Sequence, residues 1–283
     1  MKTITEELIS PKKNLFDVNL KEIWRYRDLI FLFVKRDFVA VYKQTVLGPL
    51  WFVIQPIFTT LIFTVIFGQL ASIPTDGLPQ VLFYMCGIST WNYFSECFTK
   101  TSNTFVSNSN IFGKVYFPRL VLPISTVISC LLKFFIQFSL FLLFLIYYIY
   151  NGANVTPNAH VIVFPFIILI MAGLALGLGI IISSLTTKYR DFQFLVVFGV
   201  QLLMYATPIV YPLSLAKEKL GDYYWVAKLN PMSSIIEATK YAFLGQGEFS
   251  FVHLFYSFSV MLILLLIGVL VFNKVEQNFM DTV

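Results

Sequence analysis

Residues 134–187, FFIQFSLFLLFLIYYIYNGANVTPNAHVIVFPFIILIMAGLALGLGIIISSLTT, form a run of 54 uncharged residues bounded by two lysines. As one helix this run would be about 80 Å long at about 1.5 Å per residue, whereas the hydrocarbon core of a bilayer is only about 30 Å thick. The segment NGANVTP at 151–157 is rich in turn-forming residues and divides the run. The stretch therefore predicts two membrane-spanning helices, near 120–149 and 160–186.

The composition of the whole chain agrees with a membrane protein. Of its 283 residues 58% are hydrophobic, 18% are aromatic and only 12% are charged, and the mean hydropathy is +0.77. A soluble domain of this composition would lack the polar surface needed to cover its core. A disordered chain, a disulfide scaffold and an ordinary soluble enzyme are thereby excluded. The three cysteines, Cys86, Cys97 and Cys130, lie in apolar runs without metal-ligand spacing and are interpreted as buried thiols.

Four further apolar stretches are long enough to span a membrane. They lie near 47–70, from Gln80 to the polar region 99–110, near 192–210 and near 250–272. We therefore expect an all-α polytopic membrane protein with six transmembrane helices. Its segments are an N-terminal region at 1–45, a transmembrane domain at 46–273 and a tail at 274–283.

The positions of Lys and Arg predict the orientation of the chain. Fifteen of the 20 lie before the first span, in the second and fourth loops or in the tail, against four on the opposite side. Loops rich in these residues stay in the cytoplasm, so both termini are expected there. The net charge of +5 is then explained by topology and not by nucleic-acid binding. No signal peptide is expected, because more than 40 charged and mixed residues precede the first span.

Residues 21–43, KEIWRYRDLIFLFVKRDFVAVYK, are amphipathic. Charged residues occupy one helical face, and Ile23, Ile30, Phe31, Val34, Phe38 and Val41 occupy the other. Such a helix lies in the plane of the membrane interface or packs on the protein as a cytoplasmic helix. The first interpretation is favoured because the segment leads directly into the first span.

Two connecting segments carry more structure than a simple turn. The loop at 107–119, SNSNIFGKVYFPR, predicts a short helix with apolar side chains on the cytoplasmic side, which suits either a partner protein or the membrane interface. Residues 211–249 contain Pro212, Gly221 and a helical stretch at 232–244. They predict short helices that dip into the outer leaflet or cap the bundle; the alternative is an interfacial loop anchored by its aromatics.

Two charges fall within predicted spans, Glu96 and Lys133. Intramembrane charges are candidate functional residues. The two side chains either pair with each other or extend separately to the headgroups. Gly173 and Gly177 form a small-xxx-small pair that indicates a helix contact.

The residues needed for catalysis are missing from the sequence. His160 and His253 are far apart, and no HExxH or GxSxG motif occurs. Gly113-Lys114 is not a P-loop, because Asn108 replaces the first glycine and Val115 replaces the Ser or Thr. We therefore expect no catalytic, cofactor or metal site, and a transport component or channel is the leading class.

A set of motifs resembles the membrane subunits of ABC transporters that export lipid-linked O-antigen, capsule or teichoic-acid polysaccharides. The similarity covers nearly the whole chain. The motifs are VKRDFVAVYKQTVLGPLWFVIQP at 34–56, GIST with Trp91 and Phe94, NIFGKVYFPRLVLP at 110–123, TTKYRDFQF at 186–194, YATPIVYP at 205–212, NPMSSIIEATKYAFLG at 230–245 and the C-terminal residues 275–283.

The resemblance implies a half-transporter in the bacterial inner membrane. Two copies would form the pore for a lipid-linked polysaccharide, and two copies of a separate cytoplasmic ATPase, which binds ATP and Mg²⁺, would drive it. Residues 21–43 would be the interface helix, 107–119 the coupling helix and 211–249 the outer gate. Lys133 matches no motif of the family.

The resemblance also implies two groups of site residues. Phe112, Tyr116 and Phe117 would insert into the ATPase, with Lys114 and Arg119 steering acidic residues. Spans one and five would line the channel, and each has a helical stripe of aromatic and polar residues that suits a sliding sugar chain, although the Phe residues also suit packing against helices or lipid. The stripes are Phe52, Gln55, Thr59, Phe63 and Phe67, and Phe194, Phe198, Gln201, Tyr205 and Pro208.

Three other functions suit a protein with six spans. An ABC permease that exports a drug or lipid is disfavoured only by the family motifs above and by the richness in aromatic residues. A stand-alone channel or secondary transporter is disfavoured because residues 1–150 and 151–283 show no repeat. A membrane-embedded sugar transferase is disfavoured because the loops lack clustered carboxylates.

Overall fold

The computed structural model describes residues 20–43, 45–112, 117–189 and 191–279, and within these ranges every regular element is a helix. The prediction of an all-α membrane protein is confirmed at this level. Among these described residues, four stretches are long and apolar enough to cross a membrane. They are Gly48–Leu70 (η1 Gly48–Leu50, α3 Trp51–Phe63 and η2 Thr64–Leu70), α7 (Val121–Tyr150), Ala159–Thr186 (η3 Ala159–Val163 and α8 Phe164–Thr186) and Phe251–Val275, which is most of α13 (Phe251–Phe279).

The other two predicted spans are helices that do not meet both criteria. α4 (Gln80–Ser102) has 23 residues but many polar ones, and α9 (Phe192–Tyr205) is apolar but has only 14. α4 contacts α3, α7, α8, α9 and α12 (Pro231–Leu244), and most of its side chains are buried. Because protein surrounds α4, its polar side chains do not have to face lipid.

The break that divides the long apolar run is confirmed. Residues 151–158 connect α7 to η3, and Gly152 adopts a φ of +74°, which glycine tolerates without strain. The Asn158 side chain accepts a hydrogen bond from the His160 N–H at 3.0 Å and so caps the next helix. The Asn158 N–H and side-chain amide also donate to Ala242 and Tyr241 carbonyls at 3.0 and 2.8 Å. The connection is therefore anchored on the end of α12.

Glycines bring α8 and α13 into close contact, as the small-xxx-small pair predicted. A Cβ atom on Gly177 would lie 2.9 Å from the backbone of Leu264 and Leu265, and one on Gly173 would meet the Met261 side chain. Without side chains at these positions, the two helices pack backbone against backbone.

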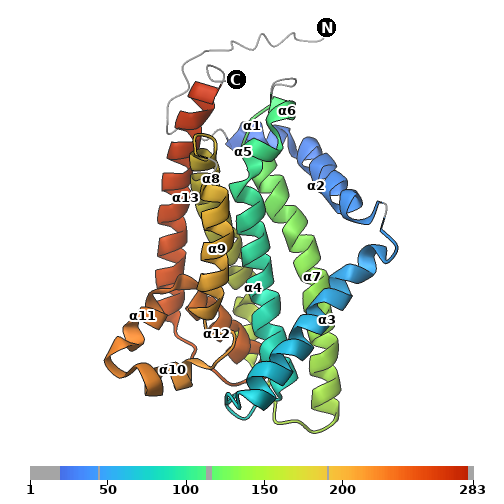
Figure 1. Cartoon of the computed structure of the whole chain (residues 1–283), viewed down its shortest axis with the longest axis vertical. Coiled ribbons are helices and arrows are strands. Elements are labelled where there is room, and N and C mark those ends of the chain that lie inside the picture. The colour runs from blue at the N-terminus through green and yellow to red at the C-terminus, as the bar shows by residue number, and fades with distance from the viewer. Residues whose placement is uncertain (1–19, 44, 113–116, 190, 280–283) are drawn as a thin grey trace.

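The two ends of the bundle carry different short helices (Figure 1). α1 (Leu20–Arg25), α2 (Arg27–Tyr42), α5 (Thr104–Ser107), α6 (Ser109–Phe112) and the end of α13 lie at one end. α10 (Leu213–Leu220), η4 (Gly221–Tyr223), α11 (Tyr224–Leu229) and α12 lie at the other. The predicted helical stretch at 232–244 thus corresponds to α12, and the region 211–249 is mostly helical.

α2 runs obliquely across its end of the bundle (Figure 1). Ile30, Phe33 and Val34 are buried in an apolar cluster with residues of α7, α8 and α13, whereas Phe31 and Leu32 are exposed. The helix therefore packs on the protein through one side and leaves apolar side chains uncovered on another.

Candidate functional site

The aromatic and polar stripe of α9 is open in the single chain. Phe194 and Tyr205 are 78% and 57% exposed, and Phe198 and Gln201 are also exposed. Within α9 only Val196 is buried, because α4 and α8 cover one side of the helix. Pro208, in the turn after α9, is buried. The open face thus combines aromatic rings with one side-chain amide.

The stripe of the first span is more covered. Phe52 is buried beside Phe38, with ring centroids 6.1 Å apart. Phe63 and Phe67 are half-buried and contact each other at 5.2 Å between centroids. Gln55 is exposed, and its carbonyl accepts a hydrogen bond from the half-buried Thr59 hydroxyl at 2.9 Å. Gln55 is therefore the stripe's most open polar side chain.

The two intramembrane charges form an ion pair, which is one of the two arrangements considered for them. Lys133 Nζ donates to Glu96 Oε2 at 2.7 Å, and the second oxygen, Oε1, pairs with Lys100 Nζ at 2.9 Å. The Lys133 Nζ also lies 5.2 Å from the centre of the Phe52 ring. One carboxylate thus joins α4 to α7, beside the start of α3.

The coupling segment is only partly described. Lys114 and Tyr116 lie outside the described residues, and Phe112 closes α6 with a side chain that is not described. Phe117 is 4% exposed and packs on Phe33 with ring centroids 5.8 Å apart. Arg119 is also buried. These last two side chains are therefore covered by their own chain.

A cavity of about 530 Å³ borders the coupling segment and was not predicted from the sequence. It lies between α2, the end of α4, α5, α6 and the start of α7. Arg36, Asp37 and Lys100 bring charge to its wall, and Asn103 and Thr126 bring polar groups. Its walls come from five helices, which explains why no single stretch of sequence reveals it.

Residues 211–249 contain a buried charge pair that was not predicted from the sequence. Lys240 Nζ lies 3.4 Å from Glu237 Oε1, and both side chains are almost completely buried. Burial raises the pKa of Glu237 and lowers the pKa of Lys240, and the attraction between the two charges opposes both shifts. Opposite charges three residues apart in an apolar helix were the available signal.

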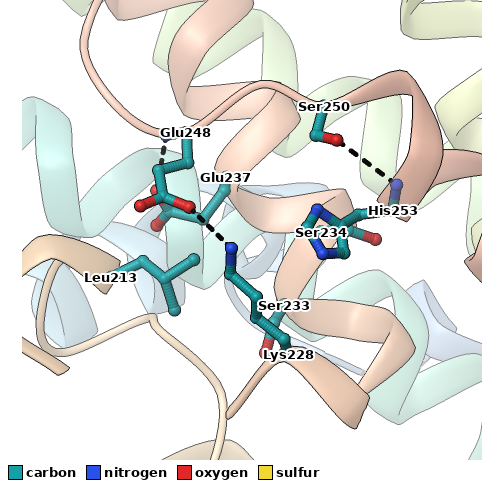
Figure 2. A pocket seen from close by; sticks show the side chains of 8 residues that line it. All are labelled: Leu213, Lys228, Ser233, Ser234, Glu237, Glu248, Ser250 and His253. Atoms are coloured by element: carbon teal, nitrogen blue, oxygen red, sulfur yellow. Dashed lines mark hydrogen bonds and ion pairs between the residues drawn. The ribbon is translucent and has the colours of Figure 1, made fainter. Parts of the chain in front are cut away.

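A small pocket of about 20 Å³, room for about one water, lies next to Glu237 (Figure 2). Its lining includes Lys228, Glu237, Glu248 and Ser233. The Ser233 hydroxyl is buried and forms no hydrogen bond to protein. Within the described residues no group of three or more His, Cys, Asp or Glu side chains is placed to hold a metal ion.

The family model described as ABC-2 type transporter matches residues 28–244. The chain belongs to the ABC-2 type transporter family. The match begins in α2 and ends with α12, so the two aromatic and polar stripes, residues 107–119 and the Glu237–Lys240 pair of this family member all lie inside it. It is a transport subunit and not an enzyme, and its apolar helices make it a multi-pass membrane protein.

Three relatives of this ABC-2 family member share one name, O-antigen export system permease protein RfbA. Two O-antigen export system permease proteins RfbA of Klebsiella pneumoniae are 28% and 27% identical to it, each covering 90% of this chain and 94% of the relative. An O-antigen export system permease protein RfbA of Myxococcus xanthus is 29% identical and covers 77% of this chain and 80% of the relative.

Proposed function

We propose that the chain is the transmembrane subunit of an ABC exporter that moves a lipid-linked, O-antigen-like polysaccharide across the bacterial inner membrane. The similarity to O-antigen export permeases over 90% of the chain carries this proposal. The open α9 face supports it, because aromatic rings suit the C–H faces of sugars and amides suit their hydroxyl groups.

The topology that we propose has six spans, with α4 and α9 as the second and fifth, and both termini in the cytoplasm. α1 and the C-terminal end of α13, the first and last described helical segments, lie at the same end of the bundle, as an even number of crossings requires (Figure 1). The excess of Lys and Arg in the segments assigned to this end supports a cytoplasmic location. α2 would lie at the membrane surface, with Phe31 and Leu32 toward lipid.

Two copies of the chain would enclose the conduit, because the α9 stripe is open in one copy. Gln55, Gln201 and Tyr205 are the groups that we assign to it. A polar group facing lipid is unfavourable, so these side chains favour a surface that meets water, sugar or the second copy.

Two copies of a cytoplasmic ATPase, which would bind ATP and Mg²⁺, would dock on residues 107–119. Phe112 and Tyr116 are assigned to a groove of the ATPase, and Lys114 to its acidic rim. Because Phe117 and Arg119 are buried in their own chain, we assign them to hold the segment on the bundle. α10, α11 and α12 would form the outer gate.

The function is tested in a bacterial strain without its own O-antigen permease and ATPase. The strain receives this chain together with its cognate ATPase and glycan-synthesis enzymes. We expect glycan on the cell surface only when both transporter chains are present. Glycan that stays inside cells in which the two chains co-purify would refute the proposal.

Single cysteines test the topology. Cysteines at Ser72, Asn154 and Lys219 are expected to react with a membrane-impermeant thiol reagent applied outside spheroplasts. Cysteines at Lys12, Asn110 and Lys188 are expected to react only after the membrane is opened. Labelling of the Lys219 position from the inside alone would overturn the placement of the gate.

A further inference from the structure

Lys240 donates to several groups at once. Its Nζ donates to the Pro208 carbonyl at 2.6 Å and to Glu237 Oε1 at 3.4 Å, and it lies 3.7 Å from the centre of the Phe83 ring. The side chain is 1% exposed. One cation therefore joins α12, α4 and the turn that follows α9.

The Glu237 carboxylate extends these contacts to the Glu248 backbone (Figure 2). Its Oε2 accepts a hydrogen bond from the Glu248 N–H at 3.2 Å. The Glu248 side chain in turn accepts from the Tyr224 hydroxyl at 2.9 Å and pairs with Lys228 at 3.3 Å. A continuous polar network thus runs from α11 through α12 to the end of α9.

Gly247 makes the approach of the loop to Glu237 feasible. It adopts a φ of +124°, and a Cβ atom there would lie 3.1 Å from Glu237 Oε2. The turn after α9 has a second attachment to the start of α12, because the Asn230 side-chain amide donates to the Thr207 hydroxyl at 2.8 Å. The turn is therefore held at two points of α12, by Asn230 at its N-terminus and by Lys240 within its second half.

A buried ion pair is a poor device for stability alone. Removing two charges from water is expensive, and apolar side chains of similar size usually stabilise a core as well or better. The shortest hydrogen bond of Lys240 nevertheless goes to the Pro208 carbonyl in the turn after α9, and not to the Glu237 carboxylate. The geometry is that of a tether between two segments.

We propose that Lys240 is a positioning residue for export: it tethers the outer end of α9 to α12, so that this end and the gate helices α11 and α12 move as one unit. The proposal rests on the proposed function. Pro208 is the last residue of the predicted α9 stripe and follows the exposed Tyr205 by three positions. Loss of the tether would therefore change the outer end of the conduit.

Hydrogen–deuterium exchange of the full chain with its ATPase tests the tether. In Lys240→Met the amides of residues 206–212 are expected to exchange at least about tenfold faster, while those of α8 keep the native rate. Glycan exported per ATP hydrolysed is expected to fall. Lys219→Met, the same substitution at an exposed lysine of α10, should change neither quantity.

Lys240→Met leaves Glu237 buried without its cation, and the variant could fail to fold for that reason alone. The double variant Glu237→Gln/Lys240→Met removes both charges and keeps an acceptor for the Glu248 N–H. We expect it to fold with native yield and still show fast exchange at 206–212 with poor export. Native protection and native export in the double variant would overturn the proposal. If the unmodified chain exports no glycan, the proposed function fails, and the exchange data alone still decide whether Lys240 tethers the turn.

Discussion

Replacing Glu96 is expected to destabilise the protein more than replacing Lys133, although the two side chains form one ion pair. Glu96 lies between two lysines, with Lys133 at 2.7 Å and Lys100 at 2.9 Å. Lys133→Met leaves the carboxylate paired with Lys100. Glu96→Gln leaves two ammonium groups beside a neutral side chain. The two variants thus remove the same contact and leave different net charges.

The size of the difference follows from exposure and distance. The Lys133 and Glu96 side chains are 19% and 24% exposed. Their pair is therefore intermediate between two reference cases. Loss of one partner destabilises a protein by about 3–5 kcal/mol when the pair is buried, whereas an ion pair at the surface contributes about 0–1 kcal/mol to stability. Both ammonium groups contact one carboxylate, so they lie within about 8 Å of each other, where an effective dielectric constant of about 20 gives a repulsion of about 2 kcal/mol. We expect a loss of about 2–4 kcal/mol for Glu96→Gln and about 1 kcal/mol for Lys133→Met.

Thermal unfolding with a thiol-reactive fluorophore measures these effects. Cys86, Cys97 and Cys130 are all free and buried, so they react only when the bundle opens. Glu96→Gln is expected to lower the unfolding midpoint by several degrees more than Lys133→Met. The double variant Glu96→Gln/Lys133→Met, with a single lysine left, is expected to lie between them. Equal midpoints for the two single variants, or a lower one for Lys133→Met, would refute the electrostatic reasoning.

Three further predictions concern packing, the conduit and coupling. Gly177→Ala is expected to destabilise the protein by about 1–3 kcal/mol because the new methyl group meets the α13 backbone. Gly173→Ala is expected to destabilise it by less because the Met261 side chain can move. A larger loss of stability for Gly173→Ala in the same thermal assay would contradict this prediction. Gln201→Leu and Tyr205→Ala are expected to reduce surface glycan severalfold while the ATPase still co-purifies, and normal export in both would place the conduit on other helices. Phe112→Ala/Tyr116→Ala is expected to leave the permease folded and the ATPase uncoupled, so normal export with normal co-purification would place the docking site elsewhere.

The starts of the helices were predictable from sequence because charged and turn residues mark where a chain enters the apolar phase, whereas α9 ends at Tyr205 and not near the predicted 210. The predicted starts near Gln80, 120 and 192 lie within a residue of α4, α7 and α9. The break at 151–157 was equally predictable, because glycine and asparagine are favoured in turns and disfavoured in the interior of a helix. Four of the six predicted spans satisfy both length and composition in the structure.

The surroundings of individual side chains were not predictable in the same way. Helical periodicity assigns Phe52 and Gln55 to one stripe, but it does not say that Phe38 of α2 and Lys133 of α7 lie beside the buried Phe52 while Gln55 stays exposed. Phe117 was expected to project from an exposed loop, whereas it packs on Phe33, 84 positions earlier in the chain. The contacts of Lys240 with Pro208 and Phe83 likewise join segments that only the tertiary fold brings together.

α4 and α9 miss the criteria for a membrane span for opposite reasons: α4 is long enough but too polar, and α9 is apolar but too short. Each reason indicates what surrounds that helix. α4 is polar because five helices of its own chain shield it from lipid. α9 has 14 residues, about 21 Å of helix, which is shorter than the roughly 30 Å hydrocarbon core. Its backbone ends and the exposed Gln201 would then be left without hydrogen-bonding partners if lipid surrounded the helix. We infer that the open side of α9 meets protein, water or substrate in the working transporter, which is where a conduit requires it to be.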